Sequence, residues 1–127
     1  MALKVLEWTG IYQAEGSLVG EVRYVVGRML GTAHCALCDI THGSVREKKG
    51  FAACRQALPV PFKNVHLDER SETLRAFTEG KTPCVVAHTD EGLRLVLDAH
   101  MLEGCAGSVT SFRDLLDAQM RVQDLTY

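Results

Sequence analysis

Two thiols and two imidazoles lie close together near position 38 of the chain. Cys35 and Cys38 have the CxxC spacing, and His34 and His42 flank them. A CxxC pair can close a disulfide, and it can also supply two sulfur ligands to a metal ion. Because cysteine without a disulfide is common in protein cores, such a pair can equally be apolar filling. The segment leaves redox, metal-binding and structural roles open.

In the redox interpretation Cys35 is the attacking thiol and Cys38 is the resolving thiol. Thr32 can cap a short helix, which would put Cys35 at the third helical position, beside unpaired amides. These amides and the helix dipole favour the thiolate, which is the nucleophilic form. His34 and His42 can add positive charge when they are protonated. This interpretation needs no cofactor, and its expected partner is a protein thiol.

In the metal interpretation the same segment binds zinc. Cys35, Cys38 and His42 lie at positions i, i+3 and i+7, on one face of the expected helix. They can supply three tetrahedral ligands, with Cys54 or another histidine as the fourth. Covalent haem attachment is excluded, because Asp39 stands where the CxxCH pattern requires histidine.

Several other residues that could take part in chemistry are expected to be structural. Three cysteines outside the CxxC pair are expected to fill the core: Cys54, Cys84 and Cys105. Three histidines in or beside expected strands are expected to be hydrogen-bonded structural residues: His66, His88 and His100. The polar run at 68–70 is expected to be a solvated loop.

Composition limits the class of protein and its partners. The chain has 127 residues, enough for one domain spanning 1–127 with its own core. Because 14 basic side chains stand against 16 acidic ones, nucleic acid and anionic membranes are not expected as partners. The N-terminus has no apolar signal core, and five cysteines are an odd number for a paired framework. These features indicate a cytoplasmic protein with thiols that are reduced or transiently paired.

Hydrophobic spacing and turn residues predict a mixed α/β domain. A strand at 3–8, extending toward 12, precedes an amphipathic helix at 18–30. The later elements are expected as follows: a short helix at 32–43, a helix from a capping box at 44–47 to about 58, a strand at 62–67, a helix at 71–79, a hairpin of strands at 84–87 and 93–97, and a helix from 108 to about 120. A helical crossover implies that the first two strands are parallel, whereas the hairpin strands must be antiparallel.

This order resembles the thioredoxin-like fold, best over residues 62–120. There a strand, a short helix, the pair Thr82 and Pro83, a hairpin and an amphipathic helix follow one another. In thioredoxin-like proteins the proline before the third strand is usually cis and faces the active-site thiols. The resemblance therefore implies that Pro83 is cis and borders a binding site, and proline tolerates a cis bond cheaply. A trans Pro83 that merely begins a strand is the alternative.

The first half of the chain departs from this family at the active site. A thioredoxin-like enzyme carries its CxxC between the first strand and the first helix, but residues 12–18 contain no cysteine. The CxxC instead falls within an expected helical insertion around 32–58. The family's redox activity therefore cannot be transferred position by position. A third hypothesis, a non-catalytic protein-interaction domain, follows from this difference.

Overall fold

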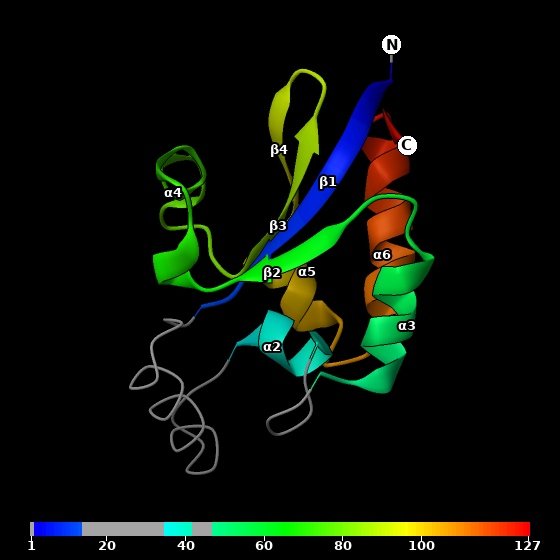
Figure 1. Ribbon diagram of the computed structural model, residues 1–127. Helices are drawn as coiled ribbons and strands as arrows, with labels where there is room; N and C mark the ends of the chain where they lie inside the picture. Colours follow the sequence, from blue (N-terminus) through cyan, green and yellow to red (C-terminus); the bar gives the residue numbers. More distant parts are fainter. Residues whose placement is uncertain (1, 14–34, 42–46) are drawn as a thin grey trace.

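The computed structural model describes residues 2–13, 35–41 and 47–127, and this part of the chain contains both strands and helices (Figure 1). In chain order the elements are β1 (Leu3–Ile11), α2 (Ala36–Thr41), α3 (Lys49–Ala57), β2 (Phe62–Val65), the short 3-10 helix η1 (Leu67–Glu69), α4 (Glu72–Thr78), β3 (Cys84–Thr89), β4 (Gly92–Leu97), α5 (Ala99–Gly104), α6 (Val109–Val122) and β5 (Leu125–Thr126).

The strands form one mixed sheet in the order β2-β1-β3-β4. β1 runs parallel to β2 and antiparallel to β3, and β4 is antiparallel to β3. β5 adds a short parallel pairing at the start of β1. The predicted mixed α/β class, the parallel crossover and the antiparallel hairpin are therefore confirmed. The hairpin turns at Gly92, whose φ of 110° is a conformation that glycine adopts without strain.

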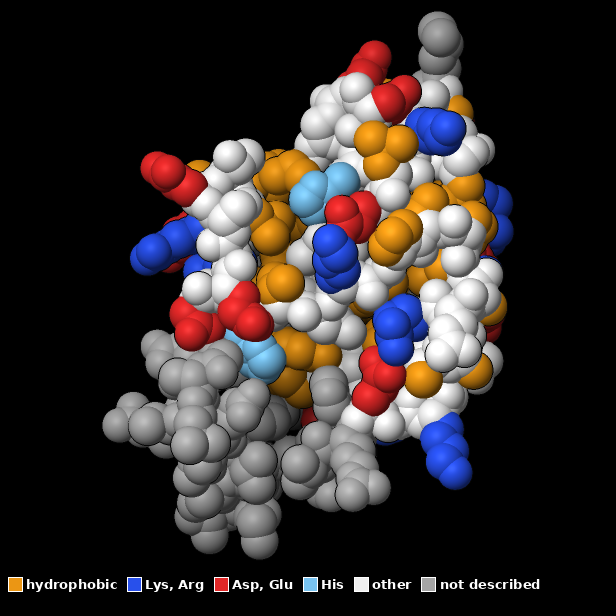
Figure 2. Space-filling model, viewed as in Figure 1, with side chains coloured by type: hydrophobic (Ala, Val, Ile, Leu, Met, Phe, Trp, Pro, Cys, Tyr) orange, Lys and Arg blue, Asp and Glu red, His pale blue; other side chains and the backbone are white. Residues whose placement is uncertain are grey.

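Helices lie on both faces of the sheet. Figure 1 shows α4 on one side and α3 and α6 on the other. The larger core lies under α2, α3, α5 and α6, and it buries Phe112, Leu116 and Met120 from α6. The smaller core lies under α4, where Leu74 packs with Ile11, Cys84 and Val86. Apolar side chains are visible along the sheet face beside α4 in Figure 2.

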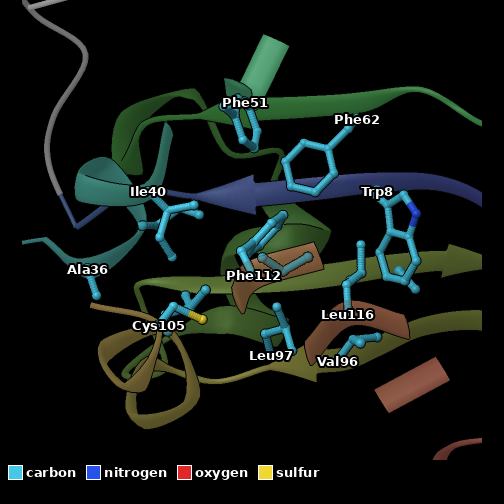
Figure 3. Packing of buried hydrophobic residues seen from close by; sticks show 14 of the residues in the cluster. Trp8, Ala36, Ile40, Phe51, Phe62, Val96, Leu97, Cys105, Phe112 and Leu116 are labelled. Carbon is cyan, nitrogen blue, oxygen red and sulfur yellow. The ribbon is translucent and has the colours of Figure 1, made fainter. Parts of the chain in front are cut away.

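Three aromatic rings join the layers of the larger core (Figure 3). Phe51 of α3, Phe62 of β2 and Phe112 of α6 have ring centroids 5.7–6.0 Å apart. Two of the three pairs meet edge to face, an arrangement that aromatic quadrupoles favour. Figure 3 also shows Ala36 and Ile40, both from α2, at the edge of this cluster. The aromatic contacts therefore help to fix the layer against which α2 packs.

Most expected elements are found, with small differences at their ends. Ser71 and Ser108 cap α4 and α6 by accepting amide hydrogen bonds from Leu74 and Ser111. Three elements were not predicted, namely η1, α5 and β5. The expected helix at 18–30 and residues 44–46 of the expected capping box lie outside the described residues.

Two expectations about local structure are wrong. The helix expected from 44 begins only at Lys49, because the backbone of Lys48 is extended. The Glu47 carboxylate pairs with Arg55 at 3.1 Å. Arg70, expected in a solvated loop, has a side chain that is only 8% exposed. Its guanidinium donates to the Leu67 carbonyl and to the Thr78 hydroxyl, so it links η1 to α4.

None of the helices within the described ranges has the length and apolar character needed to cross a membrane.

Candidate functional site: the thiol pair beside the end of β1

Cys35 immediately precedes α2 and acts as its cap. Its carbonyl accepts from the amide of Asp39 at 3.0 Å, and its Sγ accepts from the amide of Cys38 at 3.4 Å. A side chain that accepts from the amide three residues later is the usual geometry of a helix N-cap. The expectation that Cys35 occupies the third helical position is therefore wrong, because the first helical residue is Ala36. The expected contact between its sulfur and amide groups is present.

Cys35 also contacts the chain just after β1. The amide of Gln13 donates to Cys35 Sγ at 3.4 Å, although the two residues are 22 positions apart. The helices of the expected insertion, α2 and α3, do lie between β1 and β2. Although the CxxC lies far from β1 in sequence, the thiol of Cys35 lies beside the carboxyl end of β1.

The surroundings of Cys35 favour its thiolate. Its pKa is lowered from 9.0 to about 7, chiefly by a hydrogen bond with the Cys38 side chain. Backbone amides of Gln13, Cys38 and Leu37 lower it further, while burial opposes them. Cys35 is 1% exposed and Cys38 is 7% exposed, so both sulfur atoms are largely shielded from water. A thiol with this pKa is substantially ionised near neutral pH, and the thiolate is the reactive form.

The peptide bond between Thr82 and Pro83 is cis, as the resemblance implied. Thr82 hydrogen-bonds through its hydroxyl to the Gln13 side-chain oxygen. The chain that leads into β3 is thereby joined to the residue that donates to Cys35. The structure thus brings together the thiols and the residue before Pro83 through Gln13.

An aromatic and polar group adjoins the thiols at the end of β1. The Tyr12 hydroxyl is 3.0 Å from the Thr41 hydroxyl of α2, and the Tyr12 ring packs against His66 at 5.2 Å. Burial raises the pKa of Tyr12 well above its ordinary value, so its phenol stays protonated throughout the physiological range. Glu69 accepts from the backbone and side chain of His66, which lowers the pKa of that carboxyl. This group supplies a neutral hydroxyl and a paired imidazole close to α2.

The other three cysteines do not belong to this site. All five cysteines are present as thiols. Burial raises the pKa of Cys84 to about 12 and also raises that of Cys105, so both are poor nucleophiles. Cys54 is half-buried on α3 and hydrogen-bonds with Arg113 of α6. The expectation that these cysteines fill the core agrees with the burial of Cys84 and Cys105. Cys54 is only half-buried and has a polar partner, so it does not act purely as core filling.

The histidine ligands and charges expected around the thiols cannot be placed. His34 and His42 lie outside the described residues. Within the described segments, no group of three or more His, Cys, Asp or Glu side chains is arranged to hold a metal ion. The zinc arrangement of Cys35, Cys38 and His42, with Cys54 or another histidine as the fourth ligand, includes a residue outside these segments and stays a hypothesis.

The sequence did not reveal two residues of this site. Gln13 contributes a backbone amide to Cys35, and an amide carries no signature of residue type. Thr82 could have been noticed, since a hydroxyl directly before the expected cis proline stands at the same sheet end as the carboxyl terminus of β1. Comparisons with protein-family models, with curated proteins and with solved structures found no match to this chain.

Proposed function

We propose that this chain is a thiol–disulfide redox protein or redox sensor in which Cys35 attacks and Cys38 resolves. The observation that carries the proposal is the environment of Cys35 Sγ, which accepts amide hydrogen bonds from both Gln13 and Cys38. Such contacts stabilise a thiolate without requiring a neighbouring cation. The CxxC spacing keeps a second thiol within one turn of the first.

The order of the strands supports a thioredoxin-like frame for this chemistry. The sheet has the order β2-β1-β3-β4, with β3 antiparallel to both of its neighbours. Helices cover both faces, and a proline with a cis bond directly precedes β3. The hydrogen bond from the Gln13 amide to Cys35 Sγ supports this frame, because the first thiol lies beside the end of β1 although the CxxC comes later in the chain than in the family.

In exchange with a disulfide, the Cys35 thiolate attacks one sulfur of the partner. The partner's S–S bond breaks, a mixed disulfide forms, and the departing thiolate takes up a proton. Cys38 then loses its proton and attacks the Cys35 sulfur, which releases the partner as a dithiol. The pair Cys35 and Cys38 is oxidised by two electrons, and the partner's disulfide is reduced by two.

As a sensor, the same pair would react with a hydroperoxide. The Cys35 thiolate attacks one peroxide oxygen and the O–O bond breaks, so that Cys35 becomes a sulfenic acid. The other oxygen leaves as an alkoxide or hydroxide and takes up a proton, which gives an alcohol or water. Cys38 displaces the hydroxyl group as water, and the Cys35–Cys38 disulfide forms. The burial of both sulfur atoms favours small oxidants over large protein disulfides as the first reactant.

Oxidation followed by mass spectrometry tests the proposal. Treatment of the folded protein with hydrogen peroxide or a small disulfide should remove two hydrogen atoms and join the Cys35 and Cys38 peptides. Reduction with a dithiol should reverse the change. Cys35→Ser and Cys38→Ser should each abolish this product, because each lacks one of its sulfur atoms.

Cys54→Ser is the matched control, because Cys54 is a half-buried thiol outside the site. This variant should form the Cys35–Cys38 disulfide as the unaltered chain does. If the folded protein kept both thiols unoxidised under these conditions, the redox proposal would be wrong. A non-catalytic interaction domain would then be the better interpretation.

A further inference from the structure

We infer that Gln13 is a positioning residue for Cys35, and that the Thr82 hydroxyl holds it in place from the start of β3. Gln13 forms two hydrogen bonds, one through its backbone and one through its side chain. Its amide donates to Cys35 Sγ at 3.4 Å, and its side-chain oxygen accepts from Thr82 Oγ1. The inference rests on the proposed function, in which Cys35 is the attacking thiol.

The sheet ends before Gln13, so strand pairing does not fix the backbone at this residue. The last pairing of β1 joins Ile11 with Val65 on one side and with Cys84 on the other. The amide of Tyr12 still donates to the Val65 carbonyl, at 2.9 Å. Gln13 is exposed and follows this last contact with β2. Its side-chain bond to Thr82 therefore fixes its peptide from the β3 side.

A small movement of this peptide would change the hydrogen bond to sulfur. Hydrogen bonds weaken steeply when their angle worsens, and the amide reaches Cys35 Sγ at a distance of 3.4 Å. The Gln13 amide is one of the groups that lower the pKa of Cys35. Among the described residues, titratable groups near this thiolate include Cys38, whose side chain hydrogen-bonds to it, and the protonated phenol of Tyr12. Loosening Gln13 should therefore reduce the thiolate fraction without touching either thiol.

The experiment is a titration of the Cys35 thiolate by its ultraviolet absorbance. Each variant is compared with the same variant carrying Cys35→Ser, so that the difference reports the Cys35–Cys38 pair and removes the absorbance of the other thiols and the tyrosines. Thr82→Val replaces the hydroxyl by a methyl group of similar size, and Gln13→Met removes the acceptor oxygen. Each should move the midpoint upward by about half a pH unit, which lowers the thiolate fraction below the midpoint about threefold.

Three further variants separate positioning from a general loss of structure. Thr82→Ser keeps the hydroxyl and should restore the original midpoint. The double variant Thr82→Val with Gln13→Met should shift no further than either single variant, because both remove one bond. Thr89→Val, at the opposite end of β3, should leave the midpoint unchanged. Circular dichroism checks that each variant is folded.

Superimposable titrations of the unaltered chain, Thr82→Val and Gln13→Met would overturn the inference. So would additive shifts in the double variant, which would show two independent effects. Gln13 is exposed, so Gln13→Met provides the test even if Thr82→Val does not fold. Failure of the proposed function looks different: the Cys35 titration would be seen, but oxidation would not join Cys35 to Cys38.

Discussion

At the scale of one residue, ionisation of Cys35 links its hydrogen bonds to the stability of the fold. The pKa of Cys35 is about 7 in the folded chain, against the ordinary value of 9.0 for a cysteine thiol. Between these values the unfolded chain holds a proton that the folded chain has released, so the free energy of unfolding rises with pH. The gain is complete above about pH 9 and is lost as the pH falls through about 7. For a difference of two units it amounts to about 2–3 kcal/mol.

Denaturant unfolding of the unaltered chain and of Cys35→Ser, from about pH 6 to about pH 9, measures this gain. The difference in free energy of unfolding between the two proteins should grow with pH across this window. Above about pH 9, the raised pKa values of Cys84 and Cys105 make the free energy of unfolding of each protein fall with pH, because ionisation of these thiols disfavours the folded state. A difference that stayed constant with pH would contradict the lowered pKa.

The sequence predicted the sulfur atoms of this site but not the groups that surround them. Cys35 and Cys38 are distinctive by type and spacing, and so is the proline after Thr82. Gln13 acts through its amide, and its contact with Cys35 spans 22 residues. No local pattern predicts a contact of that separation. A close approach of this kind depends on how α2 packs against β1.

At the scale of elements, Gly10 sets how closely β1, β2 and α2 approach one another. A Cβ atom at this position would lie 2.5 Å from Asn64 Oδ1, 3.1 Å from Leu37 Cδ2 and 3.2 Å from Phe62 Cε1. Gly10→Ala should therefore lower the free energy of unfolding by about 1–3 kcal/mol through overpacking. Denaturant unfolding checks this value.

Gly50→Ala is the control for Gly10→Ala. Gly50 lies in α3, and the nearest atom to a Cβ there is Val109 Cγ2, at 3.9 Å. Alanine should fit and should stabilise the helix by about 0.5–1 kcal/mol, because glycine is a poor helix former. If Gly10→Ala and Gly50→Ala both lowered the free energy of unfolding, the close approach at Gly10 would not explain the effect of Gly10→Ala.

Elements with a strong local signal were predicted well, and short ones were not. α6 combines an apolar stripe with a serine cap, and β3 and β4 flank a turn that ends in glycine. α5 has only six residues, although Asp98 caps it by accepting from the amide of Met101. β5 is a strand only because it pairs with β1. Local hydrophobic periodicity does not predict which distant segments pair as strands.

At the scale of the whole molecule, Phe112 joins the helical layer to the sheet. It is fully buried, and its ring contacts Phe51 of α3 and Phe62 of β2. Phe112→Ala should lower the free energy of unfolding by about 3–5 kcal/mol, since a cavity would remain between three elements. Phe77→Ala, on the half-buried face of α4, should cost clearly less. Equal losses measured by denaturant unfolding would contradict the assignment of the main core to the α6 face.

The contact between Trp8 and Tyr127 gives the molecule a built-in optical reporter. Trp8 is the single tryptophan of the chain, and it is completely buried in β1. Its indole nitrogen donates to the Tyr127 hydroxyl at 3.2 Å, and the two rings meet edge to face. Fluorescence from this one indole therefore comes from the place where Tyr127, which follows β5, packs against β1. Emission wavelength and quenching would report release of Tyr127 from this contact separately from changes at the thiols.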